Sequence, residues 1–209
     1  MTPDELAARH PRLYHVTEPG AWPSIARHGL LSTNAALVRF EAVPEMVAEI
    51  AGYRRPAAVP LTHPEHGTLI LNDQLPLRES ALATCLDDGL TPADWLRMLN
   101  DRVFFWPDES SLERLLGARI NRDRPRDVLV FDTLSVAQAH LEQMELCPIN
   151  SGATIRRPAR RGLHTFTPVA ALSYTQWQRR RGRRDAVREV TIRHALPHPS
   201  AHLIEIRSH

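Results

Sequence analysis

The sequence predicts an α+β fold built around one core. Helix-like and strand-like segments follow one another irregularly, without the regular strand–helix–strand period of a doubly wound sheet. No glycine-rich phosphate-binding loop follows a strand, and no segment is repeated. With 209 residues, of which 43% are hydrophobic, the chain can bury one ordinary core. We therefore expect a single domain over residues 1–209.

Five elements are expected in the first third of the chain. Gly29 follows a run that contains Trp22 and Ile25, which is the pattern of a helix closed by a glycine cap. Apolar residues recur near helical spacing between 34 and 52, which predicts one amphipathic helix. The expected elements are a helix over 3–10, a strand over 12–16, a helix over 22–29, a helix over 34–52 and a strand over 68–71.

The rest of the chain alternates between helices and strands up to a long loop. Thr91 followed by Pro92 is a favourable helix start, and the apolar run inside 127–132 is typical of a buried central strand. The expected helices cover 91–100, 110–118 and 134–140, and the expected strands cover 102–106, 127–132, 144–149, 187–193 and 202–206. Between 150 and 184 we expect mainly loop, with a short helix near 168–178.

Composition excludes several classes of protein. No apolar run approaches the roughly 18 residues of a membrane helix, and no basic and apolar signal segment begins the chain. We therefore expect a soluble, cytoplasmic protein without membrane contact. Cys85 and Cys147 have apolar neighbours and no metal-ligand spacing, so buried thiols are expected. His63, Glu65 and His66 lack a further ligand, so no metal site is expected.

The net charge of +2 conceals a strongly basic segment. All 26 basic residues are arginines. Guanidinium groups fork onto phosphates and stack on bases, so this part of the chain could meet a nucleic acid. A solvated loop is an equally good interpretation. The clustered arginines are Arg156, Arg157, Arg160, Arg161, Arg179, Arg180, Arg181, Arg183, Arg184 and Arg188.

Two polar positions on strands are candidates for ligand chemistry. His15 and Thr17 lie two residues apart on a strand, so their side chains share one face and suit a flat carboxamide. Glu189 alternates with apolar residues on a distant strand, where it could stabilise a developing positive charge. A histidine satisfied within the core and a glutamate exposed on an edge strand are the simpler alternatives.

Taken in order, several segments resemble the DarT family, bacterial toxins that transfer ADP-ribose from NAD onto bases of single-stranded DNA. Two departures affect the acceptor side. Pro107-Asp108-Glu109-Ser110 stands where the family has Pro-Arg-Ser-Pro, and the family's acceptor loop is replaced by the stretch after Asn150. The segments that carry the resemblance are Leu13-Tyr14-His15-Val16-Thr17, Pro23 to Leu31, Arg54-Arg55 with Val59-Pro60 and Gly67, Val103 to Pro107, Asp127 to Val130, and Arg188 to Ile192 with Leu196-Pro197.

The resemblance implies an ADP-ribosyltransferase fold, with a split mixed or antiparallel sheet around an NAD cleft and no metal. NAD would be the substrate, and single-stranded DNA or RNA the acceptor. A partner antitoxin or hydrolase is also implied. The implied catalytic residues are Glu189 and Arg55, the NAD-binding residues are His15, Thr17, Arg54, Phe105 and Trp106, and the acceptor-binding residues are Asn150, Ser151, Arg160 and Arg161.

Two other functions remain open for such a chain. Arg54 and Arg55 are also what a solvated helix end favours, and Phe104-Phe105-Trp106 is also a plain core strand. A nucleic-acid-binding or partner-binding module could keep this fold without transferring anything. A plain NAD glycohydrolase would use water as the acceptor.

Overall fold

Two antiparallel sheets form the centre of the fold in the computed structural model, which describes residues 1–119, 121–155, 157–181 and 187–209. Predictions for Arg156, Arg183 and Arg184 lie outside the described residues. A three-stranded sheet has the order β1-β6-β11, and a four-stranded sheet has the order β5-β9-β7-β8. Their strands are β1 (Arg12–Thr17), β6 (Asp127–Asp132), β11 (Leu203–Ser208), β5 (Arg102–Phe105), β9 (Glu189–Arg193), β7 (Met144–Cys147) and β8 (Thr167–Pro168).

The two sheets meet at the bridge between Tyr14 and Trp106. The backbone N–H of Tyr14 donates to the Trp106 carbonyl at 3.0 Å, and the N–H of Trp106 donates to the Tyr14 carbonyl at 2.8 Å. Because this bridge lies just past the end of β5, the strands separate beyond it and leave room between β1 and β5. The predicted α+β class with a split antiparallel sheet is confirmed.

The largest core lies where both sheets pack against the helices over residues 3–9, 22–28, 133–140 and 174–181. Leu13, Phe105 and Phe131 are fully buried there, and the rings of Phe105 and Phe131 pack edge to face. This burial of aromatic and branched side chains is the main stabilising contribution of the two sheets. The apolar run predicted for 127–132 is the central strand β6, which pairs with β1 on one side and with β11 on the other.

Helices surround the sheets and largely match the prediction. Thr2 and Thr91 close capping boxes at the starts of α1 and α6, as expected for Thr91. The helices are α1 (Pro3–Arg9), α2 (Trp22–His28), α3 (Thr33–Arg39), α4 (Pro44–Gly52), α5 (Glu79–Ala83), α6 (Pro92–Asn100), α7 (Glu109–Leu116), α8 (Thr133–His140) and α9 (Tyr174–Arg181). Short 3₁₀ turns occupy Leu141–Gln143, Val169–Ala171 and Pro199–Ala201.

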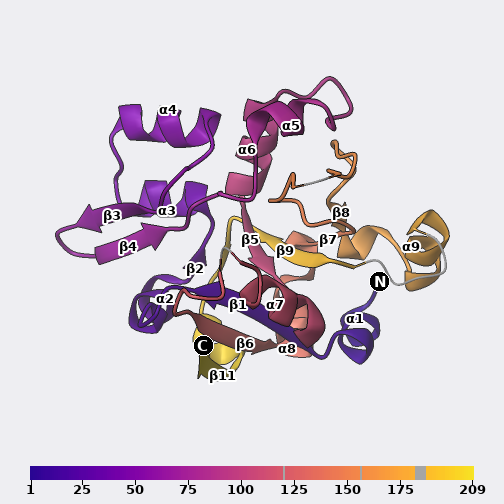
Figure 1. The fold of residues 1–209 in the computed structure, drawn as a ribbon. Helices are drawn as coiled ribbons and strands as arrows, with labels where there is room; N and C mark the ends of the chain where they lie inside the picture. The colour runs from indigo at the N-terminus through magenta and orange to yellow at the C-terminus, as the bar shows by residue number, and fades with distance from the viewer. Residues whose placement is uncertain (120, 156, 182–186) are drawn as a thin grey trace.

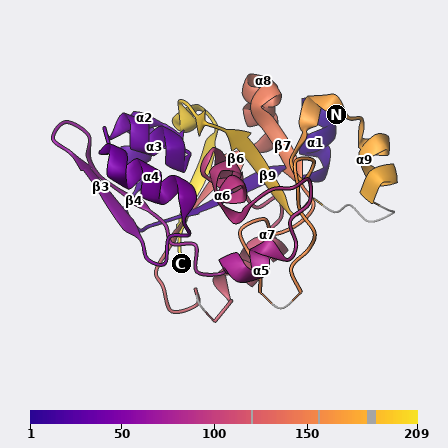
Figure 2. The same cartoon turned by 90° about the horizontal axis from the view of Figure 1, so that it is seen from above.

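The single helix predicted over 34–52 is wrong. Ser32 caps α3, Glu41 has a φ of 49°, and Pro44 begins α4, so the chain turns between two short helices. The hairpin of β3 (Val59–His63) and β4 (Gly67–Leu71) follows, and its first strand was not predicted because it contains Pro60. These segments stand to one side of the sheets, opposite α9 (Figures 1 and 2).

Smaller differences concern ends of elements and short pairings. The last two predicted strands are β9 and β11, and the helix predicted near 168–178 is a 3₁₀ turn followed by α9. A two-stranded pairing of β2 (Leu30–Leu31) and β10 (Ala195–Leu196) was not predicted. Both cysteines are free and buried, as predicted. Within the described ranges, no helix has the length and apolar character needed to span a membrane.

Candidate functional site

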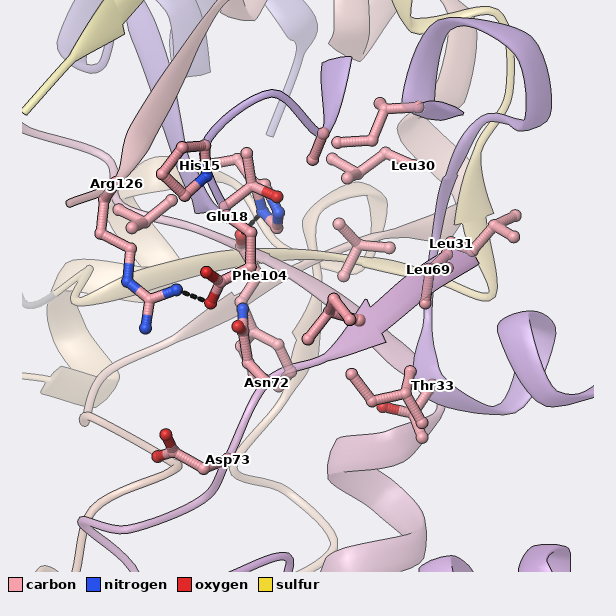
Figure 3. A pocket seen from close by; sticks show the side chains of 18 of the residues that line it. His15, Glu18, Leu30, Leu31, Thr33, Leu69, Asn72, Asp73, Phe104 and Arg126 are labelled. Atoms are coloured by element: carbon pink, nitrogen blue, oxygen red, sulfur yellow. Dashed lines mark hydrogen bonds and ion pairs between the residues drawn. The ribbon is translucent and has the colours of Figure 1, made fainter. Parts of the chain in front are cut away.

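A pocket of about 550 Å³ opens where β1 and β5 separate. Its walls come from the end of β1, helix α2, strand β4, strand β5 and the segment that precedes β6. Figure 3 shows His15 and Phe104 lining it together with Glu18, Asn72 and Arg126. The volume falls within the roughly 300–1,000 Å³ that is usual for small-molecule sites.

His15 is held in one tautomer by the neighbouring sheet. Its Nδ1 lies 2.9 Å from the carbonyl oxygen of Phe104. A carbonyl only accepts, so Nδ1 must carry the proton. Burial lowers the pKa of His15, and the ring is therefore neutral at pH 7. Its Nε2 is then a hydrogen-bond acceptor, and no described residue bonds to it.

Thr17 and Trp106 line the same pocket as His15. Thr17 is two residues beyond His15 on β1 and is largely buried. Trp106 lines the pocket beside the bridge to Tyr14. Phe105 does not line it, because strand alternation turns this side chain into the main core. Phe104 contributes to the site instead, because its carbonyl accepts the hydrogen bond from His15 Nδ1.

Arg55, and not Arg54, lines the pocket. Arg55 is only 8% exposed, and its Nε donates to the Asn72 carbonyl at 3.0 Å. Its Nη1 donates to Oδ1 of Asn100 at 2.9 Å. Burial lowers the pKa of Arg55 to about 10, with Asp73 acting in the opposite direction, so the side chain stays cationic at neutral pH. Arg54 points elsewhere and donates to the carbonyls of Leu77 and Leu75.

The pocket contains two carboxylate–arginine pairs that the sequence did not suggest. Glu18 forms an ion pair with Arg126. Asp73 forms one with Arg124 at 2.7 Å, and its other oxygen accepts from the backbone N–H of Leu75 at 3.2 Å. All four residues line the pocket. No sequence pattern marks these pairs, because Glu18 lies just after the predicted strand and the two arginines lie in an irregular segment before β6.

Glu189 lies in the interior, outside the lining of this pocket. Its side chain is on the face of β9 that it shares with Thr191, which pairs with Phe104. The backbone N–H of Ser151 donates to Oε1 at 3.1 Å, and Oε2 has no hydrogen-bond partner among the described residues. Glu189 is 4% exposed. Burial raises its pKa to about 7, although the bonds from Ser151 and the charge of Arg161 act against this rise.

The residues predicted to meet an acceptor fall into two groups. Ser151 and Arg161 are buried, and Arg161 donates to the carbonyls of Ser151 and Ala153 at 2.8 and 3.1 Å. The guanidinium also lies near the Trp95 ring. These contacts fix the loop between β7 and β8. Asn150 and Arg160 are exposed, and Arg160 pairs with Asp87. The predicted roles of these four residues stay predictions.

Asn100 is the buried residue that sequence reasoning missed most completely. It is 1% exposed, accepts from Arg55 and donates through Nδ2 to the Ile50 carbonyl at 2.9 Å. It therefore links α4 and α6 to the cationic group of the pocket. Only its position at the end of a predicted helix was visible in the sequence. No three His, Cys, Asp or Glu side chains of the described residues form a metal-ligand group.

Three comparisons place the chain among known proteins. The model of DUF7002, a family of unknown function, matches residues 11–203. No curated protein matches the chain in sequence. The solved structures that match include Thermus sp. 2.9 DarT in complex with NAD+, at 18% identity and a TM-score of 0.39 over 94% of this chain and 81% of that one. DarT from the same organism in complex with ADP-ribosylated ssDNA matches at 15% identity and a TM-score of 0.36, over 89% and 76%. Similarity at this level assigns no activity.

Proposed function

The chain belongs to the DUF7002 family, and we propose that it cleaves the nicotinamide–ribose bond of NAD and transfers ADP-ribose to an acceptor. The observation that carries the proposal is His15 in the pocket, with its proton fixed on Nδ1 and Nε2 as an acceptor. A primary carboxamide such as that of nicotinamide offers N–H donors to this nitrogen. Thr17, on the same strand face, supplies a hydroxyl that can donate to the carboxamide oxygen or to a ribose hydroxyl.

Arg55 gives the pocket a cation that suits the pyrophosphate of NAD. It is anchored by Asn72 and Asn100 and has no carboxylate bonded to it within the described chain. A fixed guanidinium of this kind binds phosphate oxygens at little entropic cost. Trp106 adds an aromatic surface at the same pocket, against which a flat ring can stack.

The leaving group and the acceptor define the reaction. The C1′–N bond breaks, its electron pair goes to nicotinamide, and the ribose passes through an oxocarbenium-like state. The acceptor then bonds to C1′ and loses a proton. We propose a nucleic-acid base as the acceptor, with arginines such as Arg157, Arg179 and Arg180 attracting the polyanion to the protein. The resemblance extends this proposal to single-stranded DNA or RNA in the cytoplasm, with toxin-like action opposed by an antitoxin or hydrolase.

A second candidate follows from the position of Glu189. The resemblance makes this residue the catalytic carboxylate, yet its Oε1 is bonded to Ser151 and it does not line the pocket. For Glu189 to act, its side chain has to leave Ser151 and turn toward the ribose. If it does not turn, and no other carboxylate acts, the chain is an NAD-binding module without transfer activity.

One incubation separates the candidate functions. Purified protein is mixed with NAD labelled in the adenylate phosphate and with separate pools of single-stranded DNA, RNA and protein. Label in a nucleic acid supports the proposed transfer, and free ADP-ribose alone indicates a glycohydrolase. Unchanged NAD that binds the protein by calorimetry identifies the binding module.

We expect His15→Ala to weaken NAD binding about tenfold to a hundredfold, because losing one partner of a buried hydrogen bond costs roughly 1–3 kcal/mol. Isothermal titration calorimetry measures this change. The matched control is His164→Ala, since His164 is exposed and does not line the pocket. A lower melting temperature with unchanged NAD affinity in His15→Ala would show that His15 is only a core residue.

A further inference from the structure

Glu18 and Asp73 are the carboxylates that line the pocket in the part of the chain that the structure describes. Cleavage of the glycosidic bond of NAD places positive charge on the ribose, and a carboxylate near that charge lowers the barrier. Glu18 and Asp73 are therefore the two candidates for this role. Glu189 is not at the pocket in the observed geometry.

Both carboxylate oxygens of Asp73 already have partners. One oxygen pairs with Arg124 at 2.7 Å, and the other accepts from the N–H of Leu75 at 3.2 Å. Its side chain is 14% exposed. With both oxygens engaged, Asp73 holds the segment after β4 in place and has little capacity left for a substrate.

Glu18 is more open and lies next to the residues that would hold nicotinamide. Its side chain is 35% exposed, and Arg126 pairs with Oε1 alone. No residue of the described chain bonds to Oε2. Figure 3 shows the Glu18–Arg126 pair inside the pocket. Thr17 and Glu18 both line the pocket, so a ribose that contacts Thr17 comes within reach of the Glu18 carboxylate.

The backbone of Glu18 is fixed by a tight turn. Its carbonyl accepts from the N–H of Ala21 at 3.2 Å, and Gly20 within the turn has a φ of 74°, which glycine tolerates. The N–H of Gly20 donates to Asp127 on β6 at 2.8 Å. The turn thus connects the Glu18 backbone to the central strand, and the ion pair with Arg126 holds the carboxylate in the pocket.

We propose that Glu18, rather than Glu189, is the catalytic carboxylate that faces the ribose of NAD. This inference rests on the proposed function. The C1′–N bond breaks with its electron pair passing to nicotinamide, while the Glu18 carboxylate stabilises the ribosyl cation. The acceptor forms the new bond to C1′, and its proton passes to Oε2 and then to water. Arg126 holds the Glu18 side chain in the pocket through the ion pair at Oε1.

The test compares Glu18→Gln, Glu189→Gln and Arg126→Gln with the wild-type protein. Nicotinamide release gives kcat, and calorimetry gives the Kd for NAD. Glu18→Gln is expected to lower kcat about a hundredfold while the Kd changes by less than about threefold. Arg126→Gln breaks the same ion pair but keeps the carboxylate, so a loss of less than about tenfold is expected. Glu142 is exposed, so Glu142→Gln is the control for effects of a Glu-to-Gln substitution outside the pocket.

The outcomes distinguish this inference from the proposed function. If Glu18→Gln keeps wild-type kcat and Glu189→Gln loses it, the inference is overturned while the proposed function stands. If Arg126→Gln loses as much as Glu18→Gln, the ion pair rather than the carboxylate matters, and the inference also fails. If the wild-type protein releases no nicotinamide, the proposed function fails and the inference with it.

Discussion

Glu189→Gln is expected to be more stable than the wild-type protein at pH 8 by up to about 3 kcal/mol. Burial raises the pKa of Glu189 from 4.5 to about 7 in the folded protein. The folded state therefore holds this proton more tightly than the unfolded state does. The contribution of Glu189 is most favourable below pH 4.5 and is lost as the pH rises through 7. The difference between the two pKa values corresponds to about 3 kcal/mol.

Urea unfolding at several pH values between 5 and 8 measures this effect. Glutamine keeps an acceptor for the N–H of Ser151 and never ionises, so the difference between the two proteins should shrink to about 1 kcal/mol or less at pH 5. The pKa of each of His15, His28, His140 and His202 is lowered, and these residues add their own dependence with the opposite sign. Only the difference in unfolding free energy between the variant and the wild type isolates the contribution of Glu189. A difference that does not change with pH would contradict the assigned pKa.

Asn100→Leu is expected to cost about 3 kcal/mol of unfolding free energy and to weaken NAD binding about tenfold. The substitution leaves the Ile50 carbonyl and the Arg55 guanidinium without their buried partner. Arg55 then loses the contact that orients it in the pocket, although Asn100 does not itself line the pocket. Thermal unfolding and calorimetry with NAD give the two quantities on the same protein.

Asn100→Asp is the matched comparison for this prediction. Aspartate keeps an acceptor for Arg55 and loses the donor to the Ile50 carbonyl, so part of the stability should be lost. Its carboxylate also neutralises Arg55, so NAD affinity should fall although Arg55 stays oriented. Wild-type NAD affinity in both variants would mean that Arg55 does not bind the pyrophosphate. Wild-type stability in Asn100→Leu would show that the buried network contributes little.

The part of the site that the sequence predicted depends on strand alternation. His15 and Thr17 share a face in any strand, so their common position followed from their spacing alone. Arg54 and Arg55 could not be distinguished in this way, because they lie outside regular structure. Arg55 is selected by Asn72 and Asn100, which are 17 and 45 residues away in the sequence. Such long-range partners leave no local pattern.

The remaining differences also have local physical reasons. The break in the predicted helix over 34–52 is marked by Pro44, which suits the first position of a new helix better than the interior of an old one. Glu18 was overlooked because simple alternation directs it away from His15. The turn from Glu18 to Ala21 brings it into the pocket, and that turn depends on Asp127 of a distant strand.

Nicotinamide release from NAD by the purified wild-type protein tests the central claim most directly. We expect release that is proportional to protein concentration and is strongly reduced in His15→Ala at the same NAD concentration. Chromatography of the reaction over time resolves nicotinamide from NAD without a label. If NAD stays as intact as it does with heat-inactivated protein, with and without nucleic acid present, the protein does not cleave the nicotinamide–ribose bond.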